Sequence, residues 1–155
     1  MGFSRPSLLT EYSLISAQDP AIDREASDLD AYERDYGYDP SHLGFVEGET
    51  PTVFRCRPLS HRTMARIYDR MVRAGKGGDV EIAVSEAALM AFRHGVADIE
   101  NLPGFEARKH VQPGPPPVIR ENWLDEAPLP LDIIIEIGSV ILARSRLTET
   151  QRKNW

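Results

Sequence analysis

The chain has 155 residues, of which 41% are hydrophobic and 27% are charged, a composition typical of one globular domain with its own core. No apolar run approaches the roughly 18 residues that cross a bilayer, because Glu136 interrupts the best candidate, and the first residues lack the apolar stretch of a signal peptide. The single cysteine, Cys56, excludes an intramolecular disulfide and favours folding inside a cell.

The net charge of −6 is distributed unevenly along the chain. Residues 1–50 carry three arginines against eleven acidic residues, a net of −8, whereas residues 51–78 carry six arginines and Lys76 against Asp69 alone, a net of +6. This segregation predicts a charged contact, in which either the acidic segment folds back over the basic one or two copies of the chain meet.

We expect an α+β fold that is mainly helical, with three or four helices and a short strand or hairpin within residues 45–58. Residues 1–50 are expected to form an extended acidic N-terminal arm, and residues 51–155 a small helical α+β domain. Within the arm, Ser27 to Tyr36 predicts a short polar helix, because Leu29, Tyr32 and Tyr36 recur at helical spacing as one adhesive stripe.

The next segment predicts a strand followed by a helix. Residues 51–59 form the best strand, and alternation places Phe54 and Cys56 on one face. Ser60 is the expected N-cap of a helix over residues 61–74. That helix has an apolar stripe of Met64, Ile67, Tyr68, Met71 and Val72. It also has a stripe of arginines at helical spacing, Arg62, Arg66, Arg70 and Arg73.

Two further helices complete the predicted domain. One covers Val80 to Gly95, with Gly95 as its C-cap, and the other covers about Pro130 to Ser145. Residues 112–117 predict a stiff polyproline-like link, after which Trp123 anchors the loop on the core. A short, separately capped turn is expected from Thr148. The predicted core consists of Phe54, Met64, Ile67, Met71, Leu89, Phe92, Ile134, Ile137, Ile141 and Leu142.

No set of residues is arranged for catalysis, so we expect a protein that is not an enzyme and has no cofactor or metal. The four histidines, His42, His61, His94 and His110, lack metal-ligand spacing. Lys76-Gly77-Gly78 is better explained as the end of a helix than as a phosphate loop, which precedes a helix.

Cys56 and the carboxylates near the last helix have structural explanations. Cys56 lies between two arginines, which would lower the pKa of its thiol, but we interpret it as a small core residue. The alternative is an enzyme in which Cys56 acts with a distant histidine. Asp132 fits the first turn of the last helix, where the helix dipole favours negative charge. Glu136 is expected to face solvent or Arg144.

The arginine stripe has three interpretations: a solvated helix face, a surface that grips carboxylates of a partner protein, or a surface that follows a phosphate backbone. Because the chain is acidic overall and no aromatic residue alternates with the arginines, protein is favoured over nucleic acid. With the charged tail, the candidate partner-binding residues are Arg62, Arg66, Arg70, Arg73, Arg146, Leu147, Arg152 and Trp155.

Three pieces of the sequence carry a resemblance: Thr52–Ser60, Phe92–Leu102, and Leu129–Ile137 followed by Ser145–Glu149 and Arg152–Asn154. In this order they resemble a group of small tailed-bacteriophage proteins encoded among the virion morphogenesis genes, some of which are labelled tail assembly chaperones. The resemblance covers about residues 50–155, and the acidic arm and the polyproline link fall outside it.

The resemblance implies a non-enzymatic structural or assembly protein that binds other virion proteins, as a minor virion component of the tail or head–tail region. Two alternatives are a tail assembly chaperone absent from the mature virion and a nucleic-acid-associated protein that uses the Arg62–Arg73 stripe. The implied partners are other phage structural proteins or copies of the same chain, with no membrane. The implied location is the virion, or the host cytoplasm during assembly.

Overall fold

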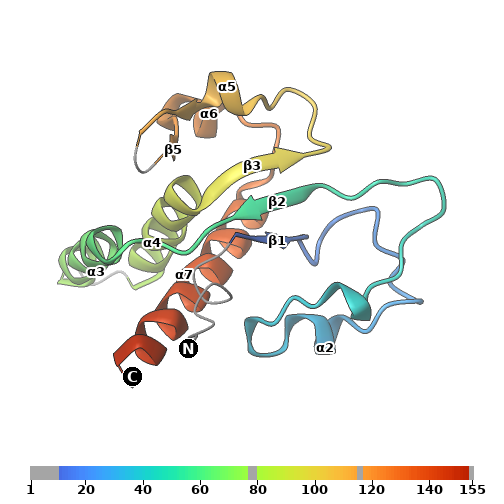
Figure 1. The fold of residues 1–155 in the computed structure, drawn as a ribbon, viewed down its shortest axis with the longest axis horizontal. Coiled ribbons are helices and arrows are strands. Elements are labelled where there is room, and N and C mark those ends of the chain that lie inside the picture. The colour runs from blue at the N-terminus through green and yellow to red at the C-terminus, as the bar shows by residue number, and fades with distance from the viewer. Residues whose placement is uncertain (1–10, 77–79, 115–116, 154–155) are drawn as a thin grey trace, which may run out of the picture.

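The computed structural model describes residues 11–76, 80–114 and 117–153, and within them it has the predicted α+β, mainly helical fold (Figure 1). The helices are α2 (Leu29–Glu33), α3 (His61–Lys76), α4 (Val80–Gly95), α5 (Ala107–His110), α6 (Glu121–Glu126) and α7 (Leu131–Lys153), with short 3₁₀ turns η1 (Arg34–Tyr36) and η2 (Pro40–His42). The strands are β1 (Tyr12–Leu14), β2 (Val53–Cys56), β3 (Val96–Glu100), β4 (Val111–Gln112) and β5 (Val118–Ile119).

The main sheet is antiparallel in the order β1-β2-β3, so the predicted strand β2 lies at its centre. Leu14 and Ile99 flank Phe54 in register, one from each neighbouring strand. Phe54 and Cys56 are both buried, as alternation predicted, and the Phe54 ring meets the Phe92 ring of α4 edge-on at 5.9 Å. The prediction of one strand or hairpin therefore missed β1 and β3.

The start of α3 is fixed by two hydroxyl groups. Ser60 Oγ accepts a hydrogen bond from the backbone N–H of Thr63 at 3.2 Å, which confirms the predicted N-cap. One residue earlier, the N–H of Leu59 donates to Ser145 Oγ at 2.9 Å, and that hydroxyl donates to the carbonyl of Ile141 at 2.8 Å. The buried Ser145 of α7 thus holds the chain that leads into α3.

Helices α4 and α7 pack closely because glycines lie where they meet. A Cβ atom at Gly138 of α7 would overlap the backbone carbonyl group of Ala88 in α4. A Cβ at Gly95 would lie 2.5 Å from Ile141 Cγ2. Among the glycines that the structure describes, the positive φ values belong to Gly48 and Gly104, and the chain runs directly from α4 into β3. Gly95 is therefore needed for the close approach of the helices and does not act as the predicted left-handed C-cap.

The first fifty residues contribute to the core as far as they are described. Tyr32 of α2 is buried, its hydroxyl donates to the carbonyl of Ile15 at 2.6 Å, and its ring lies 4.6 Å from that of the buried Tyr38. Tyr36 is 50% exposed, so its predicted place on the same stripe is wrong. Asp35 and Tyr36 have left-handed φ values of 54° and 56°, which end the helical periodicity.

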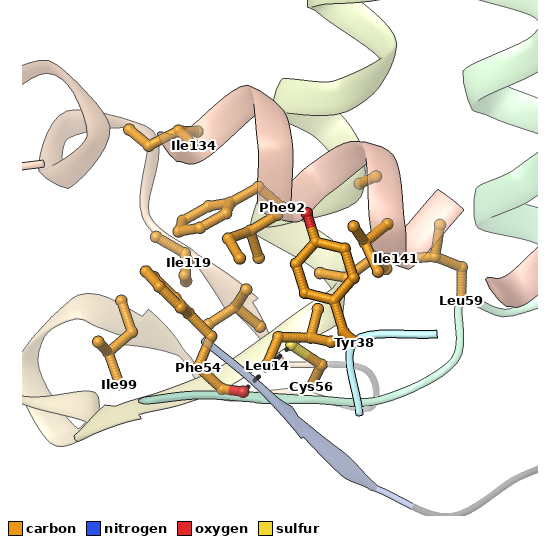
Figure 2. Close-up of a cluster of buried hydrophobic side chains, with 14 of the residues drawn as sticks. Leu14, Tyr38, Phe54, Cys56, Leu59, Phe92, Ile99, Ile119, Ile134 and Ile141 are labelled. Atoms are coloured by element: carbon orange, nitrogen blue, oxygen red, sulfur yellow. Dashed lines mark hydrogen bonds between the residues drawn. The ribbon is translucent and has the colours of Figure 1, made fainter. Parts of the chain in front are cut away.

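Figure 2 shows how the core is shared between segments far apart in the sequence. Leu14 and Tyr38 from the first fifty residues lie with Phe54, Phe92 and Ile141. The predicted core residues that are buried are Phe54, Met64, Ile67, Phe92, Ile134, Ile137 and Ile141; Met71, Leu89 and Leu142 are half-buried against it. Buried residues absent from the predicted set include Leu14, Tyr32, Tyr38, Val96, Ile99 and Ile119.

The last third of the chain confirms one prediction and corrects another. Trp123 is buried, with its ring 5.0 Å from Phe105, as predicted for an anchor. The predicted polyproline-like link of residues 112–117 includes residues 115–116, which lie outside the described part, but its first residue, Gln112, belongs to β4 and pairs with Val118 of β5. Helix α7 continues to Lys153, so no separate turn begins at Thr148. None of the described helices is long and apolar enough to cross a membrane.

Candidate protein-binding surface

The arginine stripe of α3 lies on the surface of the molecule. Met64 and Ile67 turn the apolar side of the helix inward, which leaves the side chains of Arg62, Arg66, Arg70 and Arg73 exposed. Arg73 pairs with Asp69 on the same helix at 3.1 Å, and both side chains are largely exposed. The other three arginines form no ion pair with any residue that the structure describes, so they are available to an external partner.

Arg146 of α7 is exposed on a different side of α3 from the arginine stripe, because it contacts Tyr68 of the apolar stripe. Its guanidinium lies 5.8 Å from the ring centroid of Tyr68, within the range of a cation–π contact. We define the basic face as Arg62, Arg66, Arg70 and Arg73. The side chains of the three other predicted partner-binding residues are not described. Leu147 and Arg152 lie where only the backbone of α7 is described, and Trp155 lies outside the described residues.

Apolar surface accompanies the basic face. Val72, on α3, is 57% exposed, and Val84 of α4 is exposed as well. A cavity of about 320 Å³ opens between α3, α4, α6 and α7, and Arg70 is part of its wall. Its apolar lining consists of Leu89, Met90, Leu124, Leu131 and Ile134, and its charged lining of Arg70, Glu86, Arg93, Glu121 and Asp125. Sequence periodicity gave no sign of this cavity, because its walls come from four separate helices.

Glu136 holds the first fifty residues against α7. Its carboxylate accepts hydrogen bonds from Ser16 Oγ at 2.5 Å, the Ala17 N–H at 2.8 Å and Tyr38 Oη at 2.7 Å. Gln18 Nε2 adds a fourth donor at 3.1 Å. The expectation that Glu136 faces solvent or Arg144 is therefore wrong, because this carboxylate is the acceptor that four donors of a distant segment share.

Arg144 lies two turns further along the same helix and also contacts the first fifty residues. It donates to the backbone carbonyls of Tyr36 at 3.2 Å and of Gly37 at 2.5 Å. Its guanidinium lies 4.6 Å from the ring centroid of Tyr12. Glu136 and Arg144 thus each bind the arm, and the acidic segment rests on α7 and β2.

The hydroxyl groups at this contact keep their protons. Burial raises the pKa of Tyr38 above its ordinary value, and the hydrogen bond and negative charge of Glu136 raise it further. Burial also raises the pKa of Tyr32. Tyr38 therefore remains a donor to the carboxylate, as a structural contact requires.

His94, at the end of α4, lies among cations. Burial lowers its pKa, and the charges of Arg93, Arg66 and Arg57 lower it further, which favours the neutral imidazole. Its neighbour Arg93 donates to the carbonyl of Ile119 at 3.0 Å and helps to hold β5. The positive charge around His94 therefore comes from the neighbouring arginines and not from His94 itself.

Cys56 is a core residue. It is fully buried on β2, and burial raises the pKa of its thiol, so the thiolate needed for nucleophilic attack is disfavoured. We expect the native thiol to react with a disulfide reagent such as DTNB far more slowly than the thiol of the urea-unfolded chain. The rate of absorbance change with and without urea measures this, and a native rate equal to the unfolded one would reopen the alternative of a reactive cysteine.

The remaining sequence candidates do not come together in the structure. His110 packs beside Phe105 and Trp123, and its Nδ1 accepts a hydrogen bond from the backbone N–H of Glu106 at 3.0 Å, whereas His42 lies exposed in η2. In the part of the chain that is described, no three histidines, cysteines or carboxylates are grouped as metal ligands. Comparisons with protein-family models, with curated proteins and with solved structures found no match.

Proposed function

We propose that this protein is a non-enzymatic structural or assembly protein of a tailed bacteriophage that binds other virion proteins, as a minor virion component of the tail or head–tail region. The observation that carries the proposal is the basic face, an exposed row of arginines with an apolar-lined cavity beside Arg70. The sequence resemblance over about residues 50–155 supplies the phage setting.

A protein partner suits this surface better than a nucleic acid. Arginine binds carboxylates in bidentate geometry, and it is enriched with apolar anchors at the centres of protein interfaces. Val72 and the neighbouring cavity supply such apolar surface. The net charge of −6 opposes binding to a polyanion as a whole, although a local contact of the arginines with phosphates is the alternative.

We expect mass spectrometry of purified virions to detect the chain, because a minor component stays in the particle. Presence in intracellular assembly intermediates with absence from virions would support the chaperone alternative instead. Absence from both would contradict the proposal. Cross-linking within the particle is expected to join the neighbourhood of Lys76, at the end of α3, to a different virion protein.

A fluorescence titration with duplex DNA tests the alternative that the protein binds nucleic acid. At about 50 mM NaCl, where phosphate contacts are strongest, we expect no saturable binding. Binding that weakens steeply with salt and disappears in the Arg62→Gln/Arg66→Gln/Arg70→Gln variant would favour the nucleic-acid function. Arg108→Gln/Lys109→Gln/Arg120→Gln is the matched control, since it removes the same charge from exposed residues elsewhere.

A further inference from the structure

The two ends of the molecule carry opposite charge. Six exposed carboxylates in the first fifty residues form no side-chain hydrogen bond or ion pair within the described structure: Glu25, Asp30, Glu33, Asp35, Glu47 and Glu49. We call this group the acidic face. The positive charges in the same segment are Arg24 and Arg34. Arg24 donates a hydrogen bond to the backbone carbonyl of Ala17 at 3.2 Å. The acidic face therefore carries an excess of negative charge, and the basic face carries an excess of positive charge.

Within the described part of one chain, the acidic face does not pair with the basic face. The arm is tied to α7 through Glu136 and Arg144, and β1 pairs with β2. Figure 1 shows α3 at one end of the long axis and the loops of the arm toward the other, with α7 and the sheet between them. Among the described residues no ion pair joins the arm to α3, so the predicted alternative in which the arm folds back over the basic helix is not the arrangement seen there. The other predicted alternative is a contact between copies.

Exposed apolar side chains follow the same division. The large hydrophobic residues of the described chain that remain exposed are Tyr36, Phe45, Val46, Val72, Val84 and Leu131. The first three belong to the arm, among the acidic residues. The other three lie on α3, on α4 and at the cavity beside Arg70. Each charged end therefore also offers apolar surface that a contact would bury.

We propose that this protein associates with copies of itself head to tail, with the acidic face of one chain on the basic face of the next. Opposite charges would orient the encounter, and arginine–carboxylate pairs with the flanking apolar residues would hold it. Because the two surfaces differ, each bound chain still presents one free face. Such a contact does not stop at a dimer but continues into a ring or an open chain.

The wild-type chain tests the proposal by sedimentation velocity and light scattering. At about 50 mM NaCl we expect a mass above the 17.4 kDa of one chain that rises with protein concentration, and at about 500 mM NaCl a return toward the monomer as the charges are screened. A monomer at every concentration up to about 0.5 mM in low salt would overturn the proposal.

Two complementary variants test which surfaces meet. Arg62→Gln/Arg66→Gln/Arg70→Gln weakens the basic face, and Glu33→Gln/Asp35→Asn/Glu47→Gln weakens the acidic face. Each alone is expected to be monomeric, whereas their equimolar mixture forms a dimer and nothing larger, since each variant retains one competent surface. The control variant Arg108→Gln/Lys109→Gln/Arg120→Gln should assemble as the wild type does.

Two outcomes of this experiment would contradict the head-to-tail contact. One is self-association of both variants at wild-type strength, and the other is a mixture that stays monomeric while circular dichroism shows both variants folded. A monomeric wild type would contradict self-association but not a role in the virion. Absence from virions would contradict the proposed function but not self-association. The two proposals can therefore fail separately.

Discussion

Replacing Gly138 with alanine is expected to lower the free energy of unfolding by roughly 3 kcal/mol, the upper end of the range for forcing extra atoms into a packed core. An alanine in an exposed helix would instead stabilise by about 1 kcal/mol relative to glycine. The sign is reversed here because the new methyl group would overlap the carbonyl group of Ala88, which belongs to the backbone of α4 and cannot rotate away. Urea denaturation followed by circular dichroism measures the change.

Ser139→Ala is the matched control, since it lies one residue further along α7 and is only half-buried. We expect it to change stability by less than about 1 kcal/mol. Gly95→Ala should fall between the two, because the atoms nearest to the new methyl group, Cγ2 and Cδ1 of Ile141, belong to a side chain, which can shift more easily than backbone. If Gly138→Ala were as stable as the wild type, α4 and α7 would not pack at the distance described.

Replacing Glu136 with alanine is expected to release the arm from α7 and to cost roughly 3 kcal/mol, because hydrogen bonds to a charged acceptor each contribute about 1.5–3 kcal/mol. Ser16, Ala17 and Tyr38 would lose their acceptor together. Limited trypsin digestion measures the release, since Arg24 and Arg34 lie in the arm. We expect cleavage after these residues to be much faster in the variant.

Two comparisons decide whether this effect is specific. Asp132→Ala removes an exposed carboxylate from the first turn of the same helix and should cost less than about 1 kcal/mol. In a double-mutant cycle, Glu136→Gln and Tyr38→Phe should show a coupling of at least about 0.5 kcal/mol. Additive effects, or an arm no more sensitive to trypsin, would contradict the view that Glu136 holds the arm.

The helices and the basic face could be predicted because their signals are local. Apolar residues recur at helical spacing in 61–74, so the inward side of α3 and the outward side with Arg62, Arg66 and Arg70 follow together. Ser60 lies directly before the first turn and caps it. The alternation around Phe54 identified β2 and the face it buries.

The strands beside β2 could not be predicted because their formation depends on distant partners. β3 begins immediately after Gly95, with no turn residues between the helix and the strand. It forms because Ile99 pairs with Phe54 of β2 in the sheet. β1 has only three residues and lies in a segment whose composition is that of a solvated arm. Neither strand has a strong pattern of its own.

The role of Glu136 was missed for a related reason, although a signal was present. A carboxylate flanked by Ile135 and Ile137 in an apolar helix needs a hydrogen-bonding partner if it is buried. The partners lie about a hundred residues away, and Tyr38 reaches the site only because left-handed residues redirect the chain before it. Sequence spacing indicates the need for a partner, but it does not identify the partner.

The bond between Ser16 and Glu136 spans 120 residues and has a consequence for the order of synthesis. At roughly 5–20 residues per second, about 6 to 24 seconds pass between the translation of these two residues. During that interval the arm has left the ribosome, but the helix on which it docks has not been made. We expect the high density of carboxylates in the first fifty residues to keep the segment with Leu14, Tyr32 and Tyr38 self-repelling and hydrated until α7 has been made.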